Sequence, residues 1–490
     1  MSKFYRRELH FLRDFDRNPI AFDVGTSSVI YLDKITYTIL SSGSEIEESL
    51  FVQEHGNIFP QKAIKSAFGE LIDIGILSSK PQDKETFTRV SLEETTVGGV
   101  SFNISHRCNM RCGYCFGDGG CYGGPKTNMK KEILEAGIDY LFANCGDLPY
   151  CIISFFGGEP FLNWEMMRLG ILYARSIANR RNVEIAFFIT TNGTLLTEKK
   201  LDFLNRQRVK LVVSIDGPKG IHDRERKFIG GLGSYDVVER NIKIILQKYP
   251  RIDIQVRPTI TSKSCGEVEK IYHHFKSIGI EKMHARPESR SGNRSGLSVD
   301  DYRLFSSGME SLTRAMIDAS NNGEYWGVIN VLKFLNMLYF SVVKHDYCGA
   351  GVSIISISPD GSVFPCPRFT GEKEFLLGNI LIGLDNDKRF IFLNNSVDNR
   401  LDCQNCWARY ICGGGCLYMH WIATGDYQRN DTVWCEWTRR SIETAIKAYA
   451  RLQEGDDDRM KEFFVRHTPL LSDFGEGANE LLTSILKERR

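Results

Sequence analysis

The sequence predicts an α/β protein whose central part is a sheet of parallel strands covered by helices and closed as a full or partial barrel. Between residues 101 and 288, short apolar runs alternate with longer amphipathic segments, and this alternation is typical of parallel strands joined by helices. Polar and glycine-rich motifs come directly after several of the apolar runs. Cysteines gather in two groups, one early in this central part and one after it.

Each expected element rests on the periodicity of its apolar residues. Alternating or continuous apolar runs predict strands, and apolar residues three or four apart predict helices. The expected strands are Val100–Ile104, Ile152–Phe156, Glu184–Thr190, Lys210–Ile215, Ile252–Thr259 and Lys282–Arg286. The expected helices are Lys130–Phe142, Trp164–Asn179, Glu198–Arg206, Tyr235–Gln247 and Cys265–Ile278, with a further aromatic-rich core helix at Val328–Phe340. In such barrels the chemistry lies at the carboxyl ends of the strands.

Bulk composition narrows the class of protein. A chain of 490 residues has room for about two to four domains. The net charge of +1 gives no argument for binding nucleic acid or a membrane surface, and no apolar run reaches the ~18–20 residues of a membrane span. Fourteen cysteines without a signal segment favour thiolate ligands in a reducing compartment over disulfides. We therefore expect a cytoplasmic protein.

The first cysteine group is the most informative motif. Cys108, Cys112 and Cys115 are spaced C-x3-C-x2-C, and Phe116 follows them. Three thiolates on one short loop can hold three irons of an iron–sulfur cube and leave the fourth iron without a protein ligand, which makes it a place for chemistry. A structural zinc site is the alternative, but closed zinc sites need four ligands. Cys121 lies close enough to this loop to remain undecided, whereas Cys145, Cys151 and Cys265 are expected to be buried hydrophobes.

Further motifs follow the expected strands. Gly157-Gly158-Glu159-Pro160 comes after one strand, Thr190-Thr191-Asn192-Gly193 after the next, and Ser214-Ile215-Asp216-Gly217-Pro218 after the third. Two glycines let the backbone approach a ligand closely, and the neighbouring carboxylate could accept from an ammonium group. The small hydroxyl and amide groups could bind ribose. Arg257 could pair with a carboxylate, although a surface salt bridge is the commoner role of an arginine.

Together these motifs resemble the radical S-adenosylmethionine superfamily over about residues 100–286. The resemblance implies a partial (β/α)6 barrel like that of triosephosphate isomerase. It implies a [4Fe–4S] cluster on Cys108, Cys112 and Cys115 whose open iron chelates S-adenosylmethionine, and a 5′-deoxyadenosyl radical formed on reduction. It places Gly158 and Glu159 at the methionyl amine, and Phe116 near the adenine. Ser214, Asp216 and Asn192 would lie near the ribose, and Arg257 near the methionyl carboxylate.

The second cysteine group comprises Cys348, Cys366, Cys403, Cys406, Cys412, Cys416 and Cys435. A Pro-Asp-Gly turn before Cys366 predicts a hairpin that presents this cysteine. A zinc ribbon is the alternative. The region resembles the SPASM extension, which implies two auxiliary [4Fe–4S] clusters, one on Cys403, Cys406, Cys412 and Cys435, and one on Cys348, Cys366 and Cys416. Because 349–357 contains no cysteine, the second cluster could keep an open iron that binds a substrate thiolate.

The first hundred residues contain a hairpin signal, Phe22–Val24 and Val29–Leu32 around Gly25–Ser28, and a helix that ends near Gly75. A winged-helix DNA reader would fit, but the presumed recognition helix carries only Lys62 and Lys65. The arrangement is similar to the element of ribosomal-peptide maturases that adds a leader peptide as a strand to a sheet edge. A purely structural cap on the barrel is the alternative. The tail after Arg451 is expected to be helical.

These expectations divide the chain into a winged-helix-like peptide-recognition domain (1–95), a radical S-adenosylmethionine partial barrel (96–330), a SPASM domain (331–450) and a helical tail (451–490). Pro81–Thr96 would be a linker and Ser289–Ser298 a loop.

The function implied by the resemblance is a maturase that forms a thioether between a Cys sulfur and a carbon of a ribosomally made precursor peptide bound through its leader. An external donor such as flavodoxin or ferredoxin would supply electrons. The segment Tyr114–Gly124 resembles the same region of thioether-forming maturases.

A carbon–carbon crosslinking maturase is one alternative function. A sulfatase (formylglycine) maturase is another, although such enzymes usually carry an acidic residue where this chain has Pro367. A DNA-binding redox sensor would leave the glycine and Ser-x-Asp motifs without a purpose. The sequence does not name the general base.

Overall fold

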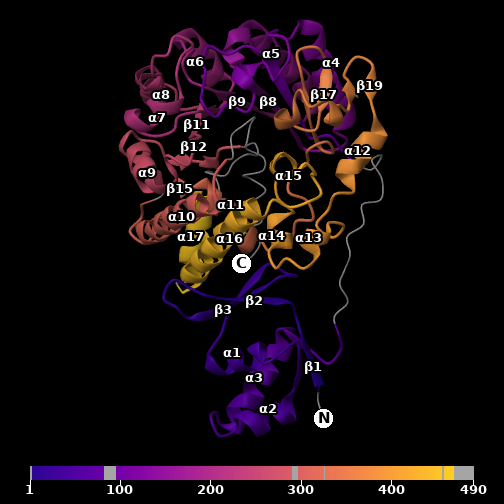
Figure 1. Ribbon diagram of the computed structural model, residues 1–490, viewed down its shortest axis with the longest axis vertical. Helices are drawn as coiled ribbons and strands as arrows, with labels where there is room; N and C mark the ends of the chain where they lie inside the picture. The colour runs from indigo at the N-terminus through magenta and orange to yellow at the C-terminus, as the bar shows by residue number, and fades with distance from the viewer. Residues whose placement is uncertain (1–2, 82–94, 290–295, 325, 455–456, 468–490) are drawn as a thin grey trace.

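The computed structural model describes residues 3–81, 95–289, 296–324, 326–454 and 457–467. Figure 1 shows a ring-shaped upper body, built by the central and carboxyl-terminal parts of the chain, and a smaller lower lobe built by the amino-terminal elements. Most of the expected linker Pro81–Thr96 and most of the expected loop Ser289–Ser298 lie outside the described residues, as does the tail from residue 468 onward.

The upper body contains the expected parallel sheet. Its barrel strands are β7 (Gly99–Ser105), β8 (Tyr150–Gly157), β9 (Glu184–Thr191), β10 (Lys210–Val213), β11 (Asp253–Val256) and β13 (Lys282–Met283). Neighbours in this series pair in parallel, β11 pairing with β13. The prediction of an α/β fold with a parallel, partial-barrel sheet is therefore confirmed.

Three expected strands are shorter than predicted: Lys210–Ile215 ends at Val213, and two others are split. The run Ile252–Thr259 is split into β11 and β12 (Thr259–Ile260), because Pro258 between them has no N–H to donate to a neighbouring strand. The run Lys282–Arg286 is likewise split into β13 and β14 (Arg286–Pro287), and β12 and β14 pair with each other in a separate two-stranded sheet.

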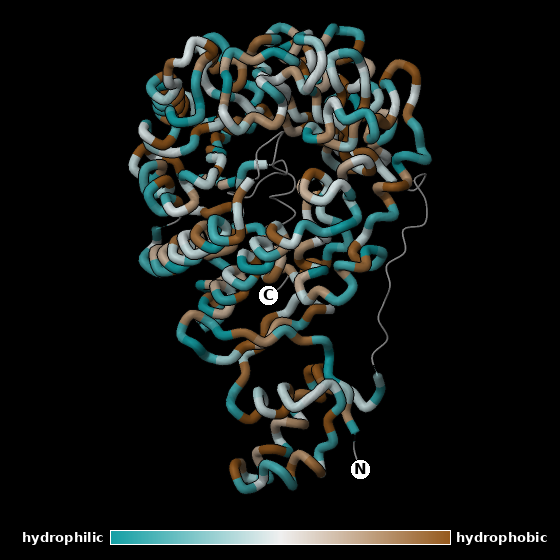
Figure 2. Tube along the Cα trace, viewed as in Figure 1, coloured by the Kyte–Doolittle hydropathy of each residue, from teal (hydrophilic) through white to brown (hydrophobic). Residues whose placement is uncertain are grey.

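Helices follow the strands and cover the outer side of the sheet (Figure 1). Alternate residues of β8 and β9 are buried against these helices, and hydrophilic and hydrophobic residues alternate along the outer helices in Figure 2. The helices are α4 (Lys131–Asn144), α5 (Trp164–Arg181), α6 (Glu198–Arg206), α7 (Lys219–Glu225), α8 (Tyr235–Lys248) and α9 (Val268–Ser277). Single 3-10 turns lie at Asp118–Gly120, Pro160–Asn163, Cys265–Glu267, Pro367–Phe369 and Lys373–Phe375.

A helical segment connects the barrel to the cysteine-rich region. It consists of α10 (Val299–Ser320), β15 (Gly327–Val328) and α11 (Ile329–Tyr339). The helix α10 begins with a capping box in which Ser298 and Asp301 satisfy each other's backbone N–H groups. The helix α11 matches the expected core helix, and most of its side chains are buried.

The carboxyl-terminal region continues the barrel sheet instead of forming a sheet of its own. The strand β16 (Ile354–Ile357) pairs in parallel with β7, and β17 (Ser362–Phe364) returns antiparallel as the expected hairpin. The strands β18 (Gly378–Asn379) and β19 (Gly383–Leu384) complete the edge. The remaining helices are α12 (Asn386–Leu393), α13 (Leu401–Gln404), α14 (Arg409–Cys412), α15 (Leu417–Thr424), α16 (Thr432–Gln453) and α17 (Asp457–His467).

The amino-terminal lobe contains two small sheets and three helices. One sheet has the order β2 (Leu9–Arg13), β3 (Pro19–Asp23), β4 (Ser28–Tyr31), which confirms the expected hairpin. The other has β1 (Lys3–Arg6) between β5 (Glu45–Glu47) and β6 (Leu77–Ser78). The helices are α1 (Lys34–Ser41), α2 (Glu48–His55) and α3 (Gln61–Asp73), and they enclose a second hydrophobic core.

The amino-terminal lobe docks on the cysteine-rich region. The His10 ring stacks on the Trp407 ring with centroids 3.8 Å apart. The buried guanidinium of Arg409 donates to both carboxylate oxygens of Glu8, over 2.7 and 2.5 Å. Trp407 directly follows Cys406, so the β2–β3–β4 sheet lies against one of the predicted cluster loops. Among the described residues, no helix is both long enough and apolar enough to cross a bilayer.

Candidate active site

The cysteine loop leaves β7 at the carboxyl end of the sheet, where barrel enzymes place their chemistry. Burial, followed by the charges of Cys115 and Cys108, raises the pKa of the Cys112 thiol to about 12, while nearby Arg226 lowers it. The three predicted cluster thiols are therefore electrostatic neighbours. The Cys108 sulfur accepts from the Met110 backbone N–H over 3.4 Å, a kind of contact that tunes iron–sulfur centres.

Three glycines form a cradle against this loop. A Cβ atom at Gly158 would lie 2.4 Å from the carbonyl oxygen of Arg107, and one at Gly120 would lie 2.4 Å from the Cα of Gly158. Gly157 has φ 124° and packs as closely on Ser105. Only glycine fits at such approaches, so the turn after β8 and the loop after Cys115 hold the cysteines from both sides.

Glu159 follows the cradle and is fully buried. One of its carboxylate oxygens accepts from the Asn192 N–H over 2.7 Å, and the other from the Thr191 hydroxyl over 2.8 Å and the Phe161 N–H over 3.1 Å. Glu159 thus ties the end of β8 to the end of β9. A carboxylate has about four acceptor positions, so one is left for a ligand, and its contact with a methionyl amine stays a prediction.

Asp216 lies at the centre of a second buried network. Its carboxylate accepts from the Tyr114 hydroxyl over 2.5 Å, from Arg226 Nε over 3.0 Å and from the Thr259 N–H over 3.0 Å. The Arg226 guanidinium also lies 5.3 Å from the centre of the Tyr114 ring. This network fixes the loop between Cys112 and Cys115 to the end of β10 and the start of β12. The bond from Tyr114 joins Asp216 to the cysteine loop, and a contact of Asp216 with a ribose stays a prediction.

The other predicted nucleotide contacts lie at the same end of the sheet. The Asn192 amide donates to Asn109 Oδ1 over 2.9 Å and lies 3.9 Å from the Cys108 sulfur. The Ser214 N–H donates to the Thr191 carbonyl, and the Arg257 N–H to the Val213 carbonyl, each over 2.9 Å. These residues therefore end β9, β10 and β11 beside the cysteine loop.

Phe116 lies where the barrel meets the cysteine-rich region. Its ring stacks near Phe156, with centroids 6.3 Å apart, and meets the Tyr418 ring at 6.4 Å. The Arg368 guanidinium lies 5.3 Å from the Phe116 ring and 5.7 Å from the Tyr418 ring. Arg368 comes two residues after Cys366 and also donates to the Ser289 hydroxyl. It was not singled out from the sequence, because only the fold brings the two cluster loops together.

The second cysteine group separates into two sets. Burial, and then the thiols of Cys416 and Cys348, raise the pKa of Cys366 to about 12. Burial and then the thiol of Cys412, together with Cys403 and Cys406, raise the pKa of Cys435 to about 12, while Arg439 lowers it. The structure thus brings together the same two sets of neighbours that the resemblance implies. Cys121 lies apart, with its thiol donating to the Asp118 carbonyl over 3.1 Å, and Cys145, Cys151 and Cys265 are buried.

Within the described part of the chain, no three His, Cys, Asp or Glu side chains converge tightly enough to hold a single metal ion. The ligands of a four-iron cluster stand farther apart than those of one ion, because each thiolate binds a different iron. The lack of such a tight group among the described residues is therefore compatible with iron–sulfur clusters on the three thiol sets.

The features of this site match those of a known class of enzyme. The family model described as the radical SAM superfamily matches residues 102–260, the segment that carries the cysteine loop, the glycine turn and the Ser-x-Asp motif. A cysteine-type anaerobic sulfatase-maturating enzyme of Clostridium perfringens is 27% identical over 335 residues, which cover 64% of this chain and 86% of that protein.

Two further relatives are a cyclopropyl synthase and a bacteriocin biosynthesis protein. The radical SAM cyclopropyl synthase TigE of Paramaledivibacter caminithermalis is 24% identical over 410 residues, covering 79% of this chain and 81% of its own. The antilisterial bacteriocin subtilosin biosynthesis protein AlbA of Bacillus subtilis is 24% identical over 359 residues, covering 69% and 71%. Among solved structures, native anSMEcpe with bound AdoMet superposes with a TM-score of 0.62 at 23% identity, over 73% of this chain and all of that one.

The chain is therefore a radical S-adenosylmethionine enzyme. Within that class it is similar to the anaerobic sulfatase maturases and to AlbA, and it shares the fold of the anSMEcpe structure over 73% of its length.

The residues present fit the cofactors of this class. Three thiols on one loop, with no fourth cysteine among their electrostatic neighbours, suit a cluster with one open iron. Cys108, Cys112 and Cys115 would hold it, and the glycine cradle would let the methionyl part of S-adenosylmethionine approach the backbone. Reduction of the bound cluster would supply a carbon radical that removes a hydrogen atom from the substrate.

Proposed function

We propose that this enzyme is a peptide maturase that joins a Cys sulfur to a carbon of a ribosomally synthesised precursor peptide. The relatives of this chain support a peptide or protein substrate, since they include a sulfatase-maturating enzyme and a bacteriocin biosynthesis protein. The amino-terminal lobe would bind the leader of the precursor. Its β2–β3–β4 sheet has β2 and β4 as edge strands to which a peptide could add.

The observation that carries the thioether assignment is the set Cys348, Cys366 and Cys416. These thiols are neighbours, and residues 349–357 supply no fourth cysteine. A cluster held by three thiolates has a position for a substrate thiolate, which is the sulfur ligand such an iron favours. Arg368, two residues after Cys366, lies 5.3 Å from the ring of Phe116, which follows Cys115, so the two cysteine loops are close enough for one substrate to reach both.

The chemistry balances if each crosslink removes two hydrogens from the substrate. The carbon loses one as a hydrogen atom, and the thiol loses the other as a proton as the carbon–sulfur bond forms. One electron is left over, and the second auxiliary cluster, on Cys403, Cys406, Cys412 and Cys435, is the proposed acceptor. An external flavodoxin or ferredoxin would supply the electron that starts each turnover.

Co-expression with a small Cys-containing precursor encoded nearby tests the proposal. Mass spectrometry of the peptide is expected to show the loss of two hydrogens for each crosslink and no reaction of that Cys with iodoacetamide. Replacement of sulfur by oxygen at the Cys would assign formylglycine chemistry instead. Loss of two hydrogens with a Cys that still alkylates would assign a carbon–carbon crosslink.

The variant Cys348→Ala/Cys366→Ala/Cys416→Ala is the matched control. It is expected to cleave S-adenosylmethionine to 5′-deoxyadenosine under dithionite but to make no thioether, because the first cysteine loop is intact. A thioether formed by this variant would contradict the role given to these three cysteines.

A further inference from the structure

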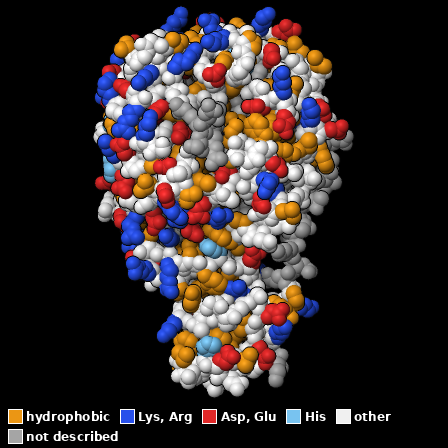
Figure 3. All heavy atoms as spheres, viewed as in Figure 1, with side chains coloured by type: hydrophobic (Ala, Val, Ile, Leu, Met, Phe, Trp, Pro, Cys, Tyr) orange, Lys and Arg blue, Asp and Glu red, His pale blue; other side chains and the backbone are white. Residues whose placement is uncertain are grey.

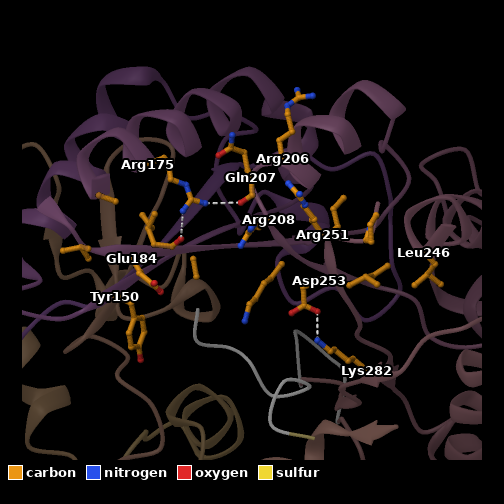
Figure 4. Close-up of a pocket in the computed structure, with 18 of the residues that line it drawn as sticks. Tyr150, Arg175, Glu184, Arg206, Gln207, Arg208, Leu246, Arg251, Asp253 and Lys282 are labelled. Atoms are coloured by element: carbon orange, nitrogen blue, oxygen red, sulfur yellow. Dashed lines mark hydrogen bonds and ion pairs between the residues drawn. The ribbon is translucent and has the colours of Figure 1, made fainter. Parts of the chain in front are cut away.

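A large cavity lies at the end of the barrel opposite the cysteine loops. It has a volume of about 1290 Å³, and Tyr150, Glu184, Lys210, Asp253 and Lys282 line it. These five residues are the first residues of β8, β9, β10, β11 and β13. The cavity is therefore built by the amino-terminal ends of the strands, and we call it the basal cavity (Figure 4).

The basal cavity carries an excess of positive charge. Six basic residues line it, against the three acidic residues Glu184, Asp253 and Glu281. The whole chain has a net charge of only +1, so the excess is local. On the face shown in Figure 3, Lys and Arg side chains gather at the upper left, where Figure 1 places α6 and α8. The basic lining residues are Arg175, Arg206, Arg208, Lys210, Arg251 and Lys282.

The six basic residues differ in how they are placed and how far they are exposed. Arg175 donates to the carbonyls of Ile185 and Gln207, over 3.2 and 3.0 Å, and Lys282 pairs with Asp253 over 2.6 Å, as the dashed lines in Figure 4 mark. Arg206 points away from the cavity in Figure 4. Arg208 and Arg251 are exposed at the rim. The pair of rim arginines thus forms the accessible part of the positive charge.

The strands β8 and β9 run from this cavity to the cysteine-bearing end of the barrel. On β8 the residues Cys151, Ile153 and Phe155 are buried against the helices, whereas their alternates from Tyr150 to Phe156 are half-buried. On β9 the alternates Ala186, Phe188 and Thr190 are likewise half-buried, and Glu184 is exposed. Side chains of a strand point to opposite faces in turn, so these partly exposed residues share the inner face of the sheet between the basal cavity and the cysteine-bearing end.

The lining suits a peptide better than a small anion. Ala178, Val183, Leu246, Ile252 and Ile280 lie among the charged residues, so the cavity offers apolar contacts as well as charge. A phosphate ion would use neither these contacts nor most of the volume. A peptide with carboxylates and apolar side chains would use both, and Arg presents a planar fork of donors to each carboxylate.

We propose that the basal cavity binds an acidic segment of the peptide substrate while the reacting residues lie at the opposite, cysteine-bearing end of the lumen. The proposal rests on the proposed function for its substrate class. It adds a specificity site for Asp or Glu at some distance along the peptide from the crosslinked positions, and Arg208 and Arg251 are the residues that would recognise it.

Fluorescence anisotropy with the cluster-loaded enzyme and a fluorescein-labelled dodecapeptide that contains four Glu among Leu and Ser tests this proposal. The peptide is expected to bind, and its counterpart with Gln at the four Glu positions to bind at least tenfold more weakly. Affinity for the Glu peptide should fall as salt rises, because exposed charges are screened over about 8 Å at physiological ionic strength. The variant Arg208→Glu/Arg251→Glu should weaken binding of the Glu peptide at least tenfold.

The control is Arg303→Glu, which reverses one exposed charge on α10, outside the basal cavity, and should change affinity less than twofold. Equal binding of the Glu and Gln peptides, or unchanged binding by the double variant, would overturn the proposal. So would rim-dependent binding of flavodoxin without any rim-dependent binding of the Glu peptide, since that result assigns the cavity to the electron donor. No step of this assay needs S-adenosylmethionine cleavage, so its failure is separate from failure of the proposed function.

Discussion

At the scale of single residues, the site is organised by buried polar groups that bond to one another and not to solvent. Asp216, Arg226 and Tyr114 form one such group, and Glu159 with Thr191 and Asn192 forms another. Each connects a strand end to a cysteine loop or to the neighbouring strand. A buried charge is costly unless it is paired, so these groups hold the loops in one arrangement only when all partners are present.

Asp216→Asn is expected to destabilise the enzyme by about 3 kcal/mol, because it leaves the buried Arg226 guanidinium without its counter-charge. The urea midpoint of unfolding, measured on protein of matched iron content, checks this value. Asp236→Asn is the control, since Asp236 is 74% exposed in its pair with Lys219 and such pairs contribute little. Equal midpoints for the two variants would contradict the importance given to the buried pair.

The stability of the folded enzyme depends on pH through His420, and the burial of this histidine sets the direction. Its Nδ1 accepts from the Asp431 N–H, and its Nε2 donates to the Gly414 carbonyl, each over 3.0 Å. Burial, and then the charge of Arg400, lower the pKa of His420 to about 4. The pKa of His420 is lower in the folded than in the unfolded enzyme. The stability that the neutral ring contributes is therefore fully present above about pH 6.5 and is lost as the pH falls through about 4.

His420→Gln is therefore expected to remove part of the acid sensitivity. Between pH 7.5 and pH 5 the wild-type enzyme should lose about 2 kcal/mol more stability than the variant does, as measured by urea unfolding at each pH. His273→Gln, at an exposed position of α9, should keep the wild-type slope. A variant slope as steep as that of the wild type would assign the acid sensitivity to other groups.

At the scale of elements, the cysteine-rich hairpin and the loop after Cys115 are fitted to each other by glycine. Gly371 has φ 89°, and a Cβ atom there would lie 2.4 Å from the carbonyl oxygen of Tyr122. Tyr122 itself has φ 52°, and its ring lies 6.0 Å from that of Phe116. The segment after Cys366 therefore rests directly on the first cluster loop.

Gly371→Ala is expected to separate these two loops, because the overlapping atom is backbone and cannot move aside cheaply. Gly123→Ala is the matched control, since Gly123 has a similar φ of 71° but nothing within 4 Å of the added carbon. The control should lose about 1–2 kcal/mol of unfolding free energy because of its left-handed backbone alone. Gly371→Ala should lose clearly more, because the added carbon also overlaps the Tyr122 backbone. Urea unfolding measures both, and equal losses would show that the loop contact is not tight.

At the scale of the whole molecule, one continuous sheet joins the barrel to the cysteine-rich region. The strand β16 pairs with β7, so the hairpin that presents Cys366 is an extension of the strand that leads to Cys108. The amino-terminal lobe is fixed at the other side of the cysteine-rich region, through Trp407 and Arg409. The three parts thus meet around the predicted clusters.

Iron analysis of cysteine variants tests how many clusters the molecule holds. If there are three [4Fe–4S] clusters, Cys108→Ala/Cys112→Ala/Cys115→Ala should lose about a third of the iron and all cleavage of S-adenosylmethionine. Cys348→Ala/Cys366→Ala/Cys416→Ala should also lose about a third of the iron but keep the cleavage. A variant of the second kind with the full iron content would remove that cluster from the proposal.

The sequence by itself determined the class of enzyme, the parallel sheet and most element bounds, because spacing and periodicity are local properties. The spacing C-x3-C-x2-C and the glycine turn are read within a few residues, and β8, α6 and α11 follow from apolar patterns. Only the tertiary structure decided that β16 extends the barrel sheet, that Arg368 lies between Phe116 and Tyr418, and that Asp216 bonds Tyr114 and Arg226. It also decided that the basic residues of the basal cavity share one end of the barrel. These contacts join residues far apart in the chain, and their geometry depends on how the strands and loops pack.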